Sequence, residues 1–137
     1  MSSKESLSAG GCLCGGVRYE VRGELRDVVA CHCSQCRRSS GHFVAATGAP
    51  SDRLTLTRCD TLAWYASSNW AERGFCSRCG SSLFWRPKEG DSSWTSIMAG
   101  TLDGPTHLRI QKHIFVADKG DYYAIADGAP QQAQWEP

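Results

Sequence analysis

The sequence predicts an all-β domain built from short strands. Apolar and polar residues alternate with a period of two through most of the chain, and long helical periodicity is absent. Gly, Pro, Ser and Asp punctuate the chain densely and confine each alternating run to a short strand. A length of 137 residues is enough for one domain with a small core.

The alternating runs place the strands as follows. They are Val17–Arg22, His42–Thr47, Leu54–Thr57, Thr61–Ala66, Glu72–Phe75, Ser82–Arg86, Trp94–Met98 and Lys112–Val116. Helical turns fit only at Ser34–Ser39 and briefly near Thr101–Gly104. On composition, the first nine residues and the segment from Gly128 have the character of loosely held ends. We therefore expect a flexible tail over residues 1–9, one domain over 10–130 and a second tail over 131–137.

Composition excludes several classes of partner. Residues 1–11 contain no apolar run that would form a signal peptide, and no stretch reaches the ~18 apolar residues of a transmembrane helix. We therefore expect a cytoplasmic protein in a reducing compartment. The formal net charge is +1 and no block of Lys or Arg occurs, so we expect neither nucleic acid nor an anionic membrane as a partner.

Cysteine is the most informative residue type in the chain. Of the eight cysteines, seven form three tight groups: Cys12-x-Cys14, Cys31-x-Cys33-x-x-Cys36 and Cys76-x-x-Cys79. In a reducing compartment such groups indicate metal binding more often than disulfides, and cysteines one residue apart would strain a disulfide. A redox motif would need a βαβ context, which the flanking sequence lacks. We predict two zinc sites, one closed by four thiolates and one held by three.

The closed site combines the first and last groups. Tetrahedral zinc with Zn–S bonds of ~2.3 Å needs sulfur atoms about 3.8 Å apart, whereas alternate side chains on a flat strand lie roughly 6.6 Å apart. The backbone must curl at Cys12 and Cys14, and glycines on both sides of the pair permit this. Together with Cys76 and Cys79, the pair is assigned to a structural zinc that fastens the N-terminal region to the centre of the chain.

The middle group leaves a coordination position open. Cys31, Cys33 and Cys36 supply three thiolates within one short segment. If Cys31 and Cys33 face one side, His32 faces the other, so we expect a packed or hydrogen-bonded histidine rather than a ligand. Cys59 could close the site, although a lone cysteine is more commonly a buried or half-exposed thiol. We predict that the three thiolates hold a second, more labile zinc, which would be the catalytic centre.

Charge limits what this second site could do. Three thiolates on Zn²⁺ leave a net negative site that polarises water weakly and suits a substrate thiolate as the fourth ligand. Arg37 and Arg38 follow the last ligand directly. These arginines either neutralise the site or bind carboxylates of a thiol substrate, and both roles stay open.

The cysteine groups and their neighbours resemble those of the glutathione-dependent formaldehyde-activating enzyme family, which also contains the centromere protein V type domain. The resemblance rests on Gly11–Val17, on Cys31–Arg37 with Gly41, and on Phe75–Leu83, and it continues through Tyr65–Ser68, Gly100–Asp103, His113–Val116 and Ala126–Pro130. Two places differ. Family members often have Pro where this chain has Gln111-Lys112, and Trp where it has Tyr122-Tyr123, and both changes would alter the wall of a pocket.

The resemblance implies a zinc-stapled β-tent fold of small antiparallel sheets. It also implies a structural zinc on Cys12, Cys14, Cys76 and Cys79 and a second zinc on Cys31, Cys33 and Cys36, the same division that the spacing gives. The activity it implies is carbon–sulfur bond chemistry. Glutathione and formaldehyde would be joined into S-hydroxymethylglutathione, or the adduct would be broken down.

Two functions from different classes fit these observations. The first is a zinc-dependent carbon–sulfur lyase acting on a thiol–aldehyde adduct, with Arg37 or Arg38 binding a carboxylate. Phe43, Trp64 or Trp85 could line its cleft, although core packing is the better prediction for each. The second is a non-catalytic zinc module that binds glutathione, another small thiol or a protein partner. The open coordination position favours the lyase, whereas the absence of an evident general acid or base favours the module.

Overall fold

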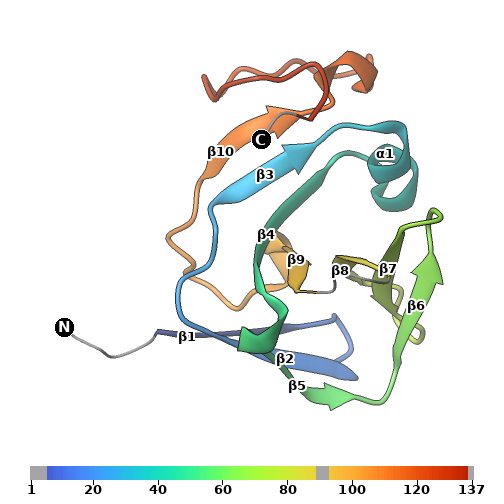
Figure 1. Cartoon of the computed structure of the whole chain (residues 1–137), viewed down its shortest axis with the longest axis vertical. Coiled ribbons are helices and arrows are strands. Elements are labelled where there is room, and N and C mark those ends of the chain that lie inside the picture. Colours follow the sequence, from blue (N-terminus) through green and yellow to red (C-terminus); the bar gives the residue numbers. More distant parts are fainter. Residues whose placement is uncertain (1–5, 89–92, 136–137) are drawn as a thin grey trace. The chain divides into compact units, whose positions relative to one another are not determined.

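The computed structural model describes residues 6–88 and 93–135, which belong to two compact units (Figure 1). The first unit comprises Met1–Arg26 and Thr47–His107, and the second comprises Asp27–Ala46 and Leu108–Pro137. Each unit takes its residues from two separate segments, so the chain passes between the units three times. The single domain over residues 10–130 stays a prediction.

The first unit contains two antiparallel groups of strands. One has the order β1-β2-β5, formed by Leu7–Gly11, Val17–Arg22 and Leu54–Cys59. The other has the order β9-β8-β7-β6, formed by Trp94–Met98, Ser82–Pro87, Ala71–Cys76 and Leu62–Ala66. Two 3₁₀ turns, η1 at Ser51–Arg53 and η2 at Ala99–Thr101, complete the described elements of the unit.

The core of the first unit follows the period-two pattern on β2. Val17, Tyr19 and Val21 are fully buried, while the residues between them are partly exposed. The Tyr19 ring meets Phe84 of β8 edge to face, with the ring centroids 5.4 Å apart. The Tyr19 hydroxyl is 2.7 Å from that of Thr101, so the one polar atom of this large buried ring is satisfied. The alternation predicted for this strand is confirmed.

The second unit is a small sheet with one helix. β3 (Val28–Cys31) lies between β10 (Ile110–Ile114) and the first residues of β4 (Val44–Pro50), and it leads into α1 (Ser34–Ser40). The 3₁₀ turn η3 covers Val116–Asp118. β3 pairs antiparallel with β4 but parallel with β10. The parallel pair departs from the antiparallel sheets that we expected, because the long connection between β3 and β10 lets the later strand return in the same direction.

Each of the eight predicted strands has a counterpart among the ten strands of the described residues, with some ends shifted. Trp94–Met98 coincides with β9, and α1 exceeds the predicted turn by one residue. β10 ends at Ile114 rather than Val116, since Phe115 adopts a left-handed conformation with φ of 56°. Two strands were not predicted. β1 has few apolar residues and lies partly in the expected tail, and the apolar run of β3 does not alternate.

The C-terminal segment is tied to β10 through backbone hydrogen bonds. His113 N–H donates to the Pro130 carbonyl at 2.9 Å, and Gln132 N–H donates to the His113 carbonyl at 2.9 Å. Val116 N–H donates to the Gln132 carbonyl at 3.0 Å. The tail that we expected from residue 131 therefore begins as bonded backbone, although its last two residues and the first five of the N-terminal tail lie outside the described residues.

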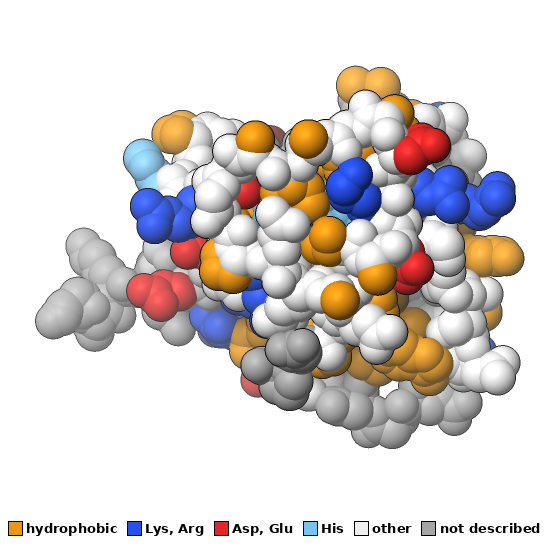
Figure 2. Space-filling view, turned by 90° about the horizontal axis from the view of Figure 1, so that it is seen from above, with side chains coloured by type: hydrophobic (Ala, Val, Ile, Leu, Met, Phe, Trp, Pro, Cys, Tyr) orange, Lys and Arg blue, Asp and Glu red, His pale blue; other side chains and the backbone are white. Residues whose placement is uncertain are grey.

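The surface carries charges of both signs. Figure 2 shows Lys, Arg, Asp and Glu side chains distributed among hydrophobic ones on one face of the molecule. This mixture agrees with the formal net charge of +1. Within residues 6–88 and 93–135, no helix combines the length and apolarity that a membrane crossing requires.

Candidate metal centres

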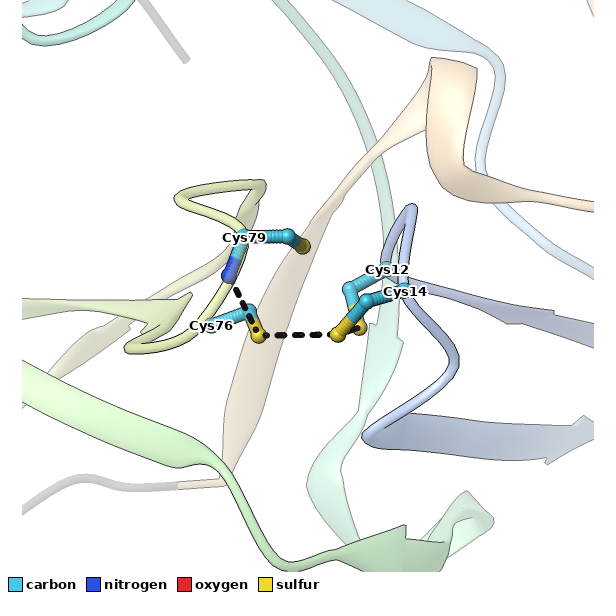
Figure 3. A group of neighbouring side chains, drawn as sticks. All are labelled: Cys12, Cys14, Cys76 and Cys79. Atoms are coloured by element: carbon cyan, nitrogen blue, oxygen red, sulfur yellow. Dashed lines mark hydrogen bonds between the residues drawn. The ribbon is translucent and has the colours of Figure 1, made fainter.

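Four cysteine sulfur atoms of the first unit come together from two turns (Figure 3). Cys12 and Cys14 lie between β1 and β2, while Cys76 ends β7 and Cys79 follows it. All four sulfur atoms lie within 4.8 Å of one another, and Cys14 Sγ is 3.7 Å from both Cys12 Sγ and Cys76 Sγ. These separations match the about 3.8 Å that tetrahedral zinc requires. The donor set and its spacing therefore fit zinc.

Both turns of this group have the same local construction. Gly15 follows the first pair and Gly80 the second, each with φ of 82°, a conformation that side chains disfavour. The backbone N–H of Val17 donates to Cys12 Sγ at 3.2 Å, and that of Cys79 donates to Cys76 Sγ at 3.3 Å. Each turn thus directs backbone dipoles at a sulfur atom, which stabilises the thiolate that a metal needs.

Side chains add to this stabilisation. A hydrogen bond from the Thr61 hydroxyl, at 3.1 Å, is the main cause that lowers the pKa of Cys76 to about 7. The Ser81 hydroxyl, 3.2 Å from Cys79 Sγ, lowers the pKa of Cys79 to about 5. Arg78 Nε donates to Cys14 Sγ at 3.4 Å and brings a positive charge to the group. Metal binding requires deprotonated thiols, so these contacts favour it.

The second unit brings together the other three predicted ligands. Cys31 ends β3, Cys33 caps the N-terminus of α1, and Cys36 lies in its first turn. Their sulfur atoms lie within 4.8 Å of one another. Cys36 N–H donates to Cys33 Sγ at 3.3 Å. Hydrogen bonds among the three sulfur atoms lower the pKa of Cys33 and raise the pKa of Cys31. Negative charge is therefore favoured on Cys33, and the three sulfur donors fit a soft metal such as zinc.

The two residues considered as fourth ligands are not part of this group. Cys59 is exposed on β5 of the first unit and belongs to neither cysteine cluster. It is therefore more exposed than we expected. His32 is 1% exposed, and both of its ring nitrogens are hydrogen-bonded, to Tyr123 and to His113. The expectation that His32 is packed rather than a ligand is confirmed.

Arg37 and Arg38 lie in the last turn of α1, which ends at Gly41. Arg37 is half-buried and Arg38 is exposed. Among the described residues, no carboxylate lies within ion-pair distance of either guanidinium. Burial raises the pKa of Tyr123, and the positive charge of Arg37 is among the smaller influences that oppose this. The role of both arginines in binding a substrate carboxylate stays a prediction.

Three aromatic residues proposed for either a cleft or the core make ring contacts. In the second unit, the Phe43 ring lies 4.7 Å from the His32 ring. In the first unit, Trp64 stacks on Phe84 at 6.0 Å, and Trp85 meets Trp70 at 5.4 Å. All three side chains are half-buried, and Trp70 is exposed, so these ring contacts lie at the edge of the core and packing within the core stays a prediction.

Sequence reasoning missed a set of polar residues around His32. His113 of β10 is 3% exposed and bonds to His32 with one ring nitrogen and to the Asp127 carboxylate, at 2.9 Å, with the other. Tyr123 bonds to the opposite nitrogen of His32. The available signal was a histidine within the strand-like run of β10, but its partners are distant in sequence and pair only in the fold.

The fold and these two clusters define a class of protein: a small mainly β protein with two thiolate groups suited to a soft metal, one complete with four sulfurs and one with three. The family model of the glutathione-dependent formaldehyde-activating enzymes matches residues 7–118. This chain belongs to that family.

Individual relatives agree with the assignment. An uncharacterized lyase of Schizosaccharomyces pombe is 31% identical over 119 residues, covering 86% of this chain and 85% of the relative. A protein of Halomonas elongata is named as a proposed glutathione-dependent formaldehyde-activating enzyme. It is 26% identical over 131 residues, which cover 87% of this chain and 81% of the relative. A Rhodobacter sphaeroides protein of known crystal structure aligns with a TM-score of 0.56 and 28% identity, over 72% of this chain and 91% of that one.

Proposed function

We propose that this protein is a zinc-dependent carbon–sulfur lyase that forms or breaks down a thiol–aldehyde adduct such as S-hydroxymethylglutathione. The observation that carries the proposal is the group of Cys31, Cys33 and Cys36, whose three sulfur atoms lie within 4.8 Å and leave one tetrahedral position for a further ligand. Family membership and the names of the relatives support a lyase related to glutathione and formaldehyde.

The roles of the protein's own residues follow from charge. A zinc ion on the three thiolates would supply a soft Lewis-acidic position for a substrate sulfur. In the forming direction, the thiol sulfur bonds to the carbonyl carbon and the thiol proton ends on the aldehyde oxygen; breakdown is the reverse. Arg37 and Arg38 stand directly after Cys36, where their guanidinium groups offset the added negative charge and bind carboxylates of the thiol.

Cobalt substitution tests this proposal directly. Cobalt bound to the three-cysteine group should give a sulfur-to-metal charge-transfer band, and millimolar glutathione should change it. Cys36→Ser should remove the response. Arg37→Ala or Arg38→Ala should weaken glutathione binding by ~1.5–3 kcal/mol if the guanidinium forms a charge-assisted hydrogen bond to a carboxylate.

The matched control is Arg58→Ala, because Arg58 lies on β5 of the first unit and pairs with Asp60. This change should leave the glutathione response intact. A response to a different small thiol but not to glutathione would reassign the substrate. Absence of a response to any thiol would overturn the lyase and favour the non-catalytic zinc module.

Turnover needs its own measurement, since thiols add to formaldehyde without a catalyst. NMR exchange between glutathione and its hydroxymethyl adduct reports the rate of interconversion in both directions. The wild-type protein should accelerate this exchange and the Cys36→Ser protein should not. Equal exchange rates with the two proteins would contradict catalysis by the three-cysteine group.

A further inference from the structure

Four side chains of the second unit form a continuous hydrogen-bond chain that includes His32, the residue between two predicted metal ligands. The Asp127 carboxylate accepts from His113 Nε2 at 2.9 Å, and His113 Nδ1 lies 2.9 Å from His32 Nε2. His32 Nδ1 is hydrogen-bonded to the Tyr123 hydroxyl at 2.5 Å. The two imidazole rings are buried, while the Asp127 side chain is 42% exposed. The chain therefore runs from the surface to the residue between Cys31 and Cys33.

The donor and acceptor roles along this hydrogen-bond chain can be assigned from the chemistry of its members. An ionised carboxylate only accepts hydrogen bonds, so His113 must carry its proton on Nε2. When both rings are neutral, His113 Nδ1 is an acceptor and His32 must donate from Nε2. His32 Nδ1 is then an acceptor as well, and the Tyr123 hydroxyl donates to it. One carboxylate thus fixes the tautomers of two successive histidines.

The ring of His32 is also held on its faces. Phe43 lies 4.7 Å away with an interplanar angle of 32°, and the Tyr123 ring lies 5.6 Å away at 28°. The backbone N–H of His32 donates to the Ile114 carbonyl at 3.0 Å. Both the ring and the main chain of His32 are therefore bonded to β10, and the ring cannot turn without breaking contacts on several sides.

The far end of the chain is fixed too. The Asp127 carboxylate accepts the backbone N–H of Ala129 at 3.0 Å, across a turn in which Gly128 has φ of 79°. The backbone N–H of His113 donates to the Pro130 carbonyl, and its carbonyl accepts from the N–H of Gln132. The C-terminal segment and β10 thus form one support for the His32 ring.

We propose that His113 and Asp127 are positioning residues that act through His32 on the loop of Cys31 and Cys33, and so preorganise the three-cysteine group for its metal. Two ligands flank His32 directly, so a fixed His32 fixes the backbone that carries them. Hydrogen-bonded partners that orient metal ligands typically change metal affinity by about 10–100-fold when removed, and we expect the lower end of that range here because His32 adjoins the ligands without being one. The inference rests on the proposed function only in requiring a metal at this group.

The test compares Asp127→Ala with Asp121→Ala. Both replace an exposed carboxylate in the same loop region of the second unit, but only Asp127 bonds to His113. Cobalt is titrated into protein whose four-cysteine group already holds zinc. We expect Asp127→Ala to weaken cobalt binding at the three-cysteine group by about 10-fold or more, with no change for Asp121→Ala. The four-cysteine group in the same molecule is the internal reference.

A second readout separates positioning from general loosening. Nitrogen-15 NMR of the histidine rings at pH 8 should show His32 with its proton on Nε2 in the wild-type protein and a mixture of tautomers in Asp127→Asn. The asparagine keeps the shape of the side chain but can donate as well as accept. Rescue of cobalt affinity by Asp127→Glu relative to Asp127→Ala would support the same conclusion.

Three outcomes would overturn the inference. These are equal cobalt affinity in the wild-type and Asp127→Ala proteins, equal weakening of both cysteine groups, and no cobalt uptake by the wild-type three-cysteine group. A failure of the proposed function looks different. If Asp127→Ala weakens cobalt binding but no thiol perturbs the cobalt spectrum, the positioning role stands and the lyase does not.

Discussion

The two cysteine groups differ in how far apart their ligands lie in sequence and in where the groups that stabilise those ligands come from. In the first unit, the four ligands come from two turns far apart in sequence, and the groups that stabilise them, such as Ser81 and the N–H of Val17, are close neighbours of the ligands. In the second unit, the three ligands lie within one short segment, and their support comes from His113, Tyr123 and Asp127. Apart from Thr61, the groups that stabilise the first set of ligands are close to them in sequence. The second set has one local hydrogen bond, from Cys36 N–H to Cys33 Sγ, and the other support that we propose for it comes from residues distant in sequence.

This difference indicates what each metal would do for the protein. A metal on the first group cross-links the N-terminal turn to the turn after β7, so its binding free energy is also folding free energy. A metal on the second group closes only a short loop that β3, α1 and β10 already hold. The first site is therefore suited to stability and the second to exchange of ligands.

The largest expected effect is a difference in folding between a mutant of the first cysteine group and a mutant of the second. Cys76→Ser should abolish soluble folding, because much of the stability of a small zinc-bound fold comes from its metal, with apparent binding free energies of about 10–16 kcal/mol in zinc fingers. Cys36→Ser should leave the fold largely intact while emptying the second group. Thermal unfolding of the two variants decides between these expectations. Equal destabilisation would mean that both sites are structural.

A smaller expected effect is a loss of stability at high pH, caused by buried Tyr19 in the core of the first unit. Burial raises the pKa of Tyr19 to about 12, whereas the unfolded chain titrates near ~10. Between these values the unfolded chain has lost the phenolic proton that the folded protein keeps. Stability is therefore fully present below pH ~10 and falls as the pH rises toward about 12, by about 2–3 kcal/mol. Urea unfolding at pH 9 and at pH 11.5 measures this loss.

The control for this prediction is Tyr19→Phe. That protein should be less stable at neutral pH, because the hydrogen bond between the phenol and the Thr101 hydroxyl is lost, but it should lack this part of the alkaline decline. An unchanged decline would assign the effect to another group. The same decline should persist in Cys36→Ser, since Tyr19 and Cys36 belong to different units.

The smallest expected effect concerns removal of the second metal. Purified protein should carry between one and two zinc ions per chain, and mild chelation should leave close to one, held by the four-cysteine group. We expect the unfolding temperature to fall by about 4 °C or less, which corresponds to about 1 kcal/mol for a chain of this size. Elemental analysis paired with calorimetry measures both quantities. Complete loss of zinc without any change in folding would remove the structural role from the first site.

Much of the fold and of the ligand set could be predicted because the signals are local. Alternation along β2 marks its buried face, and the spacing of Cys76 and Cys79 marks a turn whatever the rest of the chain does. β3 was missed because its apolar residues form a continuous run that does not alternate with polar ones. β1 was missed because its Gly and Ala residues give little difference in hydrophobicity from one position to the next.

The support of the second group could not be predicted in the same way. His113 and Asp127 lie in stretches that carry the family resemblance, but their neighbours in sequence do not predict that they bond to each other or to His32. Their role depends on the parallel pairing of β3 with β10, which places His113 beside Ala30. Pairing between strands so far apart is set by the tertiary fold rather than by any local pattern.

The parallel pairing of β3 with β10 also sets an order of events during synthesis. The ligands Cys31, Cys33 and Cys36 leave the ribosome well before β10 and Asp127 do. The four-cysteine group is complete in sequence once Cys79 has emerged, so it can take up its metal on the growing chain. The three-cysteine group acquires its surroundings only after β10 has emerged, because contacts of long sequence separation form late. A chain that terminates before β10 would therefore contain all four ligands of the first group, but it would lack the residues that we propose to support the second.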